Sequence, residues 1–185
     1  MNRFLERGRI LSLPYDLRKF ECLLVLSHDT LIDDDLYRQI ILDHYSNPRC
    51  HCRLESPTLT AEGNNPTCGD EIELDLQVEG GIIKDVGFVG DGCSISVASS
   101  SMLAEMIKGK TVNEAVKLAK TFKARLLSHS ATASEAEETF EDVDICELEA
   151  LDGVKDYPVR IKCALLGWET LLSALNQTPN SAKEG

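Results

Sequence analysis

Hydrophobic and polar side chains alternate strictly over residues 71–78. The apolar positions in this stretch are Ile72, Leu74, Leu76 and Val78. A period of two predicts a β-strand with one buried face. Gly80-Gly81 marks a turn, and residues 82–89 form a second predicted strand, so the two strands make a hairpin. A shorter strand is expected earlier, near Thr58 to Ala61.

Helical patterns surround the hairpin, over residues 31–45, 94–108, 111–127 and 158–175. Asn47-Pro48 ends the first of these helices. Thr111 and Glu114 form a capping box that opens the third, and Pro158 suits the first position of the last. Together the elements predict an α+β fold, a small antiparallel three-stranded sheet with helices packed on one side.

One domain is expected over residues 31–176, with a poorly defined N-terminal extension at residues 1–30 and a polar tail at residues 177–185. The extension has mixed charges, so it is interpreted as a loosely ordered tail or the result of a misplaced start codon. An acidic insertion at about residues 131–152 holds nine acids and no lysine or arginine. It is predicted to be a solvated, mobile face, or alternatively a surface that steers a basic partner.

Charge and cysteine content narrow the classes of function. The 185 residues include 31 acids against 19 lysines and arginines, a net charge of -12 that disfavours nucleic acid as a partner. No apolar run approaches the roughly 18 residues of a membrane span, so no membrane partner is expected. The seven cysteines are an odd number, and no secretory signal is evident. A reducing, cytoplasmic location is therefore predicted, where grouped cysteines favour metal or thiol chemistry.

Three cysteines stand at structural corners, each beside a glycine or at a helix start. Cys68 enters the hairpin and Cys93 leaves it, so both are expected to share one sheet edge with Asp70. Cys163 falls in the first turn of the last helix, well off its apolar stripe, which favours a functional role over packing. Three thiolates and a carboxylate suit a tetrahedral zinc site. The alternative is that these cysteines are small buried hydrophobic residues.

The motifs NNPTCGD, GDGCSISVASSSM and PVRIKCALLGW, with the opening LYRQIILDHYSNPR, resemble the NifU/IscU family of iron–sulfur cluster assembly proteins. The resemblance runs from Leu36 to Leu175 and implies the SufE/NifU-like fold of IscU. Lys162 stands where IscU-type scaffolds have a histidine before the last cysteine, and the preceding loop is long. Both features resemble the SufU branch, zinc-dependent sulfurtransferases that work with a SufS-type cysteine desulfurase.

This resemblance implies that zinc is held by Cys68, Asp70, Cys93 and Cys163, and that Cys68 accepts persulfide sulfur. Arg160 is a candidate stabiliser of the thiolate, or alternatively part of a surface ion pair. The sulfur would pass to a SUF scaffold complex or to apo iron–sulfur proteins. Two alternatives stay open, a scaffold that carries a transient iron–sulfur cluster and a domain with purely structural zinc.

Other candidates are weaker. Cys50-His51-Cys52 with His44 has the composition of a small metal cluster, but its place after a helix end favours an ordinary loop. The serine run at residues 99–101 predicts tight helix packing, since no His/Asp pattern accompanies it. Cys22 and Cys146 have no partner pattern.

Overall fold

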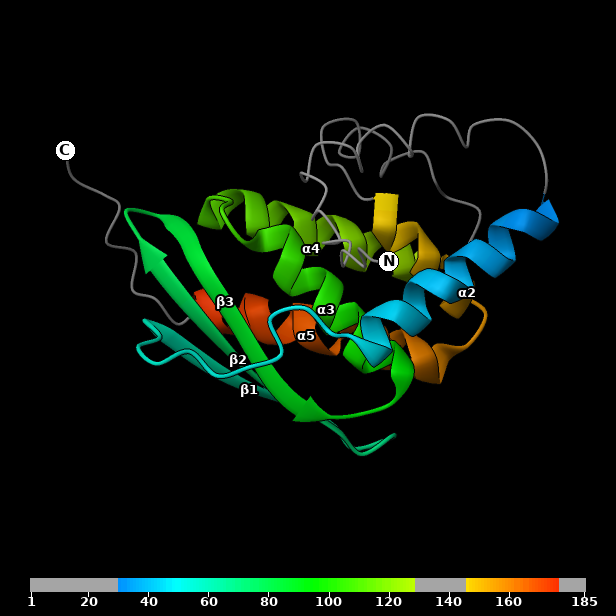
Figure 1. The fold of residues 1–185 in the computed structure, drawn as a ribbon, viewed down its shortest axis with the longest axis horizontal. Helices are drawn as coiled ribbons and strands as arrows, with labels where there is room; N and C mark the ends of the chain where they lie inside the picture. The colour runs from blue at the N-terminus through cyan, green and yellow to red at the C-terminus, as the bar shows by residue number, and fades with distance from the viewer. Residues whose placement is uncertain (1–29, 129–145, 177–185) are drawn as a thin grey trace, which may run out of the picture.

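A computed structural model describes residues 30–128 and 146–176 (Figure 1). The elements are α2 (Thr30–Ser46), β1 (Leu59–Asn65), β2 (Asp70–Glu79), β3 (Ile82–Asp91), α3 (Ser94–Ile107), α4 (Val112–Leu127), the 3-10 helix η3 (Cys146–Val154) and α5 (Pro158–Asn176). The predicted α+β class, hairpin, capping box and proline-initiated last helix are confirmed. The expected extension except Thr30, the polar tail and the first part of the acidic insertion lie outside the described residues.

The sheet is antiparallel in the order β1-β2-β3. Its register pairs Asn65 with Asp70 and Glu71 with Asp91, so the β1–β2 turn and the end of β3 meet at one end of the sheet. Gly69 has φ +73° in that turn, a left-handed conformation that glycine adopts without strain. The early strand, predicted as a short segment, extends to Asn65. This end of the sheet brings the Cys68 and Cys93 segments together.

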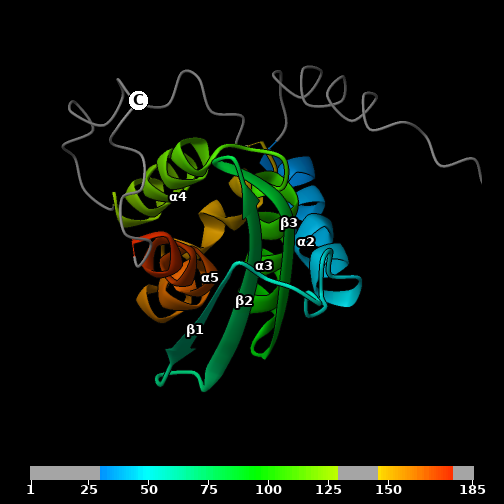
Figure 2. The ribbon, with the colours of Figure 1, turned by 90° about the vertical axis from the view of Figure 1, so that its left-hand side faces the viewer.

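Helices cover one face of the sheet, with α3 and α5 behind the strands, α4 next to them and α2 alongside α3 (Figures 1 and 2). The core is mainly aliphatic, with Trp168 packed on Phe122 at 4.8 Å between ring centroids. Trp168 Nε1 donates to Ser99 Oγ at 2.9 Å, and that hydroxyl donates to the Ala164 carbonyl at 2.6 Å. The predicted packing role of the serine run is therefore confirmed for Ser99.

The opposite face of the sheet is crossed by the segment that joins α2 to β1 (Figure 1). Asp75 points to this outer face yet is fully buried beneath the segment. Its carboxylate accepts hydrogen bonds from Arg53 Nε at 2.6 Å, Thr60 Oγ1 at 2.8 Å and the Leu54 backbone N–H at 3.1 Å. At Gly87 an added Cβ would collide with the Cys52 carbonyl, so glycine permits this close crossing.

The end of the acidic insertion is structured, contrary to the prediction of a solvated face. Leu148 and Leu151 in η3 are fully buried and join the core. Asp152 accepts a hydrogen bond from Arg125 Nε at 2.8 Å, which fastens η3 to α4. The acidic residues of η3 are thus partly exposed, while apolar residues three positions apart face inward.

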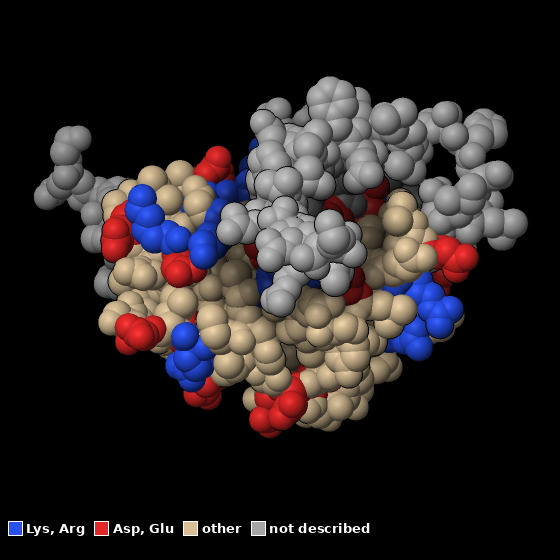
Figure 3. Space-filling model, viewed as in Figure 1, with Lys and Arg blue, Asp and Glu red and all other residues tan. Residues whose placement is uncertain are grey.

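Charged side chains of both signs are interspersed on the face seen in Figure 3. Exposed pairs such as Lys123 with Glu169, 2.7 Å apart, neutralise one another locally. Such pairs contribute at most about 1 kcal/mol each. Among the helices that the structure describes, none is long and apolar enough to cross a bilayer.

Candidate metal centre

Three metal-ligating side chains meet at the end of the sheet. One ligand atom each from Cys68, Asp70 and Cys163 lies within 4.8 Å of the others. They come from the β1–β2 turn, the start of β2 and the first turns of α5. Asp70 and Cys163 are each about 1% exposed, whereas Cys68 is exposed. The group therefore has a buried floor and one thiol that reaches solvent.

The buried carboxylate of Asp70 is held by neutral donors. Its Oδ1 accepts from the Cys93 backbone N–H at 2.9 Å, and its Oδ2 accepts from Asn65 Nδ2 at 3.3 Å. Within the described ranges no lysine, arginine or histidine forms an ion pair with it. A buried carboxylate without a counter-charge is costly, so the donor set fits a cation placed among these groups.

The Cys163 thiol is surrounded by polar partners. It accepts from Asn65 Nδ2 at 3.3 Å, and its Sγ lies 3.6 Å from the Val159 carbonyl. Burial, followed by hydrogen bonds with Asp70, Cys68 and Cys93, raises the pKa of this thiol well above its ordinary value. A bound cation would instead lower the pKa of this thiol and favour the thiolate form.

Cys93 completes the set of predicted thiols. It is exposed at the N-cap of α3, and its side chain is one of the groups that raise the pKa of the Cys163 thiol. Its sulfur is outside the tight group formed by the other three residues, while its backbone binds Asp70. The structure thus brings all four predicted residues to one sheet end, with Cys93 at the margin.

The interpretation of Cys163 from its helix position was incomplete. Burial in α5 is not confined to one stripe, because the helix contacts the sheet, α3 and α4. Cys163 is as buried as the stripe residues, although it faces the sheet end. A position off the stripe therefore does not distinguish a ligand from a packed cysteine in this helix.

Asn65 is a site residue that the sequence analysis missed. Its side chain is 5% exposed and contacts both Asp70 and Cys163. Its Oδ1 also accepts from the Thr67 N–H at 3.2 Å, an Asx-type contact within the turn that carries Cys68. The Asn-Pro pair before Cys68 was the signal available in the sequence.

The remaining candidates occupy separate places. The Arg160 guanidinium lies over the Tyr157 ring, 4.7 Å from its centroid, and Lys162 is exposed. Cys50, His51 and Cys52 lie in the loop after α2, as predicted, with the His51 ring 5.0 Å from that of Phe88. Cys22 and the side chain of Cys146 lie outside the described part of the chain.

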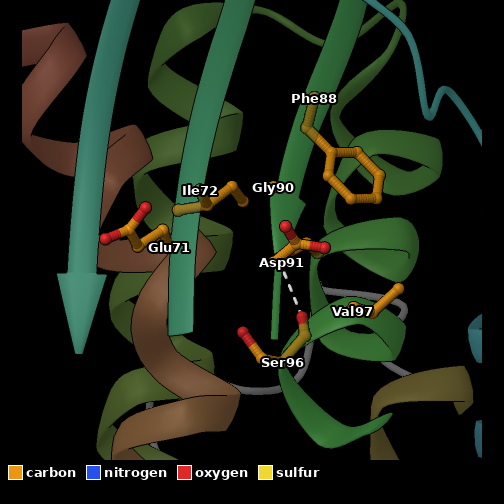
Figure 4. A pocket seen from close by; sticks show the side chains of 8 residues that line it. Glu71, Ile72, Phe88, Gly90, Asp91, Ser96 and Val97 are labelled. Carbon is orange, nitrogen blue, oxygen red and sulfur yellow. Dashed lines mark hydrogen bonds between the residues drawn. The ribbon is translucent and has the colours of Figure 1, made fainter. Parts of the chain in front are cut away.

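A small hollow opens beside the centre, between the hairpin and the start of α3 (Figure 4). Ile72, Phe88 and Asp91 line it, and the Ser96 carbonyl accepts from the Ser100 hydroxyl at 2.8 Å. An added Cβ at Gly90 would collide with the Glu71 carbonyl, so glycine lets β3 pass close to β2 here. The hollow is too small to enclose a substrate.

Comparison with known proteins decides the family. The family model described as the NifU-like N-terminal domain matches residues 36–164. The chain belongs to this NifU-like family. The resemblance found in the motifs is thereby confirmed, and the matched range contains all four residues of the candidate centre.

Curated relatives in the NifU-like family carry two kinds of name. The "Zinc-dependent sulfurtransferase SufU" of Bacillus subtilis is 43% identical over 138 residues, 75% of this chain and 88% of that protein. The "Iron-sulfur cluster assembly scaffold protein IscU" of Thermotoga maritima is 37% identical over 142 residues, 77% of this chain and 94% of that protein. The chain is thus similar to both a sulfurtransferase and a scaffold.

Solved structures support the fold of the NifU-like chain. A Fervidobacterium islandicum protein described as a scaffold for the SUF system matches with a TM-score of 0.63 and 35% identity, covering 74% of this chain and 94% of that one. The N-terminal part of a NifU-like protein from Brucella abortus matches with a TM-score of 0.66 at 24% identity, covering 83% of this chain and 100% of that one. The second likeness concerns the fold alone.

Proposed function

We propose that this protein is a SufU-type acceptor of persulfide sulfur that works with zinc in iron–sulfur cluster assembly. The observation that carries the proposal is the meeting of one exposed thiol, Cys68, with the buried Asp70 and Cys163. Similarity to the zinc-dependent sulfurtransferase of Bacillus subtilis supports the same function.

Zinc would be held by Cys68, Asp70, Cys93 and Cys163. Three sulfur donors and one oxygen donor suit a tetrahedral zinc ion. When bound, zinc would lower the pKa of the thiols and keep them as thiolates. Asn65 would keep the buried donors Asp70 and Cys163 in place through its two amide contacts.

Cys68 would perform the transfer itself, because it is exposed at the tip of the β1–β2 turn. Its thiolate attacks the outer sulfur of the persulfide on a cysteine desulfurase. A sulfur–sulfur bond to Cys68 forms, and the bond between that outer sulfur and the desulfurase cysteine breaks. The desulfurase sulfur leaves as a thiolate, so atoms and electrons balance. Arg160 would stabilise the charged sulfur if its guanidinium left the Tyr157 ring.

The partners follow from this chemistry. The donor would be a SufS-type cysteine desulfurase, and the recipient a SUF scaffold complex or an apo iron–sulfur protein. A reducing cytoplasm would keep the acceptor thiol available between cycles.

Desulfurase turnover tests the proposal. Zinc-loaded protein should accelerate the release of alanine from cysteine by a SufS-type desulfurase. Cys68→Ala should remove the acceleration, whereas Cys52→Ala, which changes another exposed thiol, should keep it. Equal turnover with and without the protein would refute the transfer role.

A second candidate is a scaffold on which an iron–sulfur cluster is assembled. The three thiols at one sheet end favour it, as does similarity to the Thermotoga maritima scaffold. Lys162 at the position before the last cysteine counts against it. Anaerobic reconstitution with iron and sulfide should give a coloured protein that passes its cluster to an apo-acceptor if this candidate is right.

A further inference from the structure

A second group of metal-ligating side chains lies where three helices meet. His44 of α2, Glu105 of α3 and Glu147 of η3 each place one ligand atom within 4.8 Å of the others. Glu105 follows Cys93 by 12 positions along the chain through α3, about 18 Å at roughly 1.5 Å per residue. The group is therefore separate from the cysteine centre.

The imidazole of His44 is fixed in the manner of a metal ligand. The residue is 2% exposed, and its Nδ1 lies 2.8 Å from Ser101 Oγ. That hydroxyl in turn accepts from the Arg49 backbone N–H at 2.8 Å, which fixes its position. A hydrogen bond at one ring nitrogen orients the other toward a metal, and this arrangement accompanies most histidine ligands.

The other ring nitrogen faces a carboxylate at a distance that suits a shared ion. His44 Nε2 lies 3.7 Å from Glu147 Oε2, beyond ordinary hydrogen-bond length. Two ligands that each lie about 2.1 Å from a tetrahedral ion are separated by about 3.4 Å. The His44 nitrogen and the Glu147 oxygen would need to move only slightly closer together to bind one metal ion.

Acidic side chains predominate in the contacts of the group that the structure describes. Arg49 pairs with both Asp43 and Glu105, at 2.5 Å and 3.5 Å, while Glu147 faces the imidazole. These described contacts set three carboxylates against one guanidinium. The Glu105 and Glu147 side chains are 22% and 41% exposed, so an ion could enter from solvent.

We propose that His44, Glu105 and Glu147 form a second metal site, which takes a divalent first-row transition metal through one nitrogen and two carboxylate ligands. This donor set suits zinc, cobalt, iron or manganese better than the soft ions that thiolates select. A bound ion would join α2 and η3 to α3. The site is independent of sulfur transfer at Cys68.

Cobalt titration of protein loaded with one equivalent of zinc tests this site, because the single zinc ion is expected at the cysteines and leaves the second site for cobalt. We expect one Co²⁺ per chain to bind with weak visible absorption and without the intense thiolate-to-cobalt band. Glu147→Gln should weaken this binding at least tenfold, and His44→Gln should do the same. Glu149→Gln, which changes a neighbouring η3 carboxylate, should leave it within twofold.

Three results would overturn the proposal. The first is wild type loaded with one equivalent of zinc that binds no cobalt, which would indicate a plain ion-pair network. The second is cobalt that gives only the thiolate band, which would report exchange at the cysteines. The third is a Glu147→Gln protein with wild-type affinity. Because Glu147 is partly exposed, this variant should fold even if His44→Gln does not.

Discussion

The Asn65 carboxamide donates to the Cys163 thiol at 3.3 Å, although 98 positions separate the two residues. The same nitrogen lies 3.3 Å from Asp70 Oδ2. One side chain at the end of β1 therefore positions a thiol on α5 and a carboxylate on β2. This contact joins the sheet and the last helix at the candidate centre.

Asn65→Ala should weaken zinc binding by roughly 10–100-fold, since groups that orient metal ligands contribute about that much. It should also lower the free energy of unfolding by about 1–3 kcal/mol, because buried partners lose their donor. Competition with a chromophoric chelator measures the affinity. Asn64→Ala, an exposed neighbour on β1, is the control. Equal affinities for the two variants would contradict the positioning role.

Asp75 should produce a measurable pH dependence of stability. Burial alone would raise its pKa, but hydrogen bonds from Arg53, Thr60 and the Leu54 backbone outweigh burial and lower it. The folded pKa is thus below the unfolded value of about 3.9. The stabilisation is therefore present above that value and is lost as pH falls through the folded pKa.

Asp75→Asn should accordingly destabilise the protein by about 1–3 kcal/mol at neutral pH. The difference in unfolding free energy between this variant and wild type should shrink below about pH 4, where Asp75 of the wild type also loses its charge. Urea unfolding at several pH values measures both effects. Asp35→Asn, at an exposed position of α2, should show neither. A difference that stays constant down to pH 3 would show that the charge of Asp75 is irrelevant.

Leu151 tests the packing of η3. Leu151→Ala should cost about 2–5 kcal/mol of unfolding free energy, because the leucine is fully buried. Leu127→Ala, at a leucine that is 53% exposed, should cost less than about 0.5 kcal/mol. Similar denaturation midpoints for the two variants would mean that η3 does not pack as described.

Removal of zinc by a chelator should lower the melting temperature without unfolding the protein at 25 °C. A ligand present at about 100 times its dissociation constant adds about 2.7 kcal/mol to the free energy of unfolding. For a chain of this size, that corresponds to a rise in melting temperature of roughly 5–10 °C. The core of Leu74, Phe122 and Trp168 is distinct from the candidate ligands, so helical circular dichroism should persist. Loss of that signal on chelation would favour a purely structural zinc.

Local signals were sufficient for much of the fold. The hairpin follows from the alternation and the Gly80-Gly81 turn, and α4 begins at its capping box. The meeting of Cys68 with Asp70 and Cys93 follows from hairpin geometry. Each of these features depends on residues close in sequence or on a register that the turn sets.

The features that were missed depend on distant segments. The alternating pattern predicts that Asp75 is an outward-facing polar residue. Its burial was missed because the segment that covers it comes from before β1. Leu148 and Leu151 lie in an acidic stretch, and the apolar pattern of the nine-residue η3 is too short to predict a packed helix. The roles of Asn65 and His44 depend on contacts with residues of α5 and α3. The periodicity of a single segment cannot reveal such contacts.

Sulfur transfer to Cys68 is measured most directly by mass. Zinc-loaded protein is incubated with a SufS-type desulfurase and cysteine, then analysed intact and after digestion. We expect a gain of one sulfur atom that maps to the peptide containing Cys68 and is absent from Cys68→Ala. A protein that gains no sulfur, or gains it equally in Cys68→Ala, would contradict the assignment of Cys68 as the acceptor.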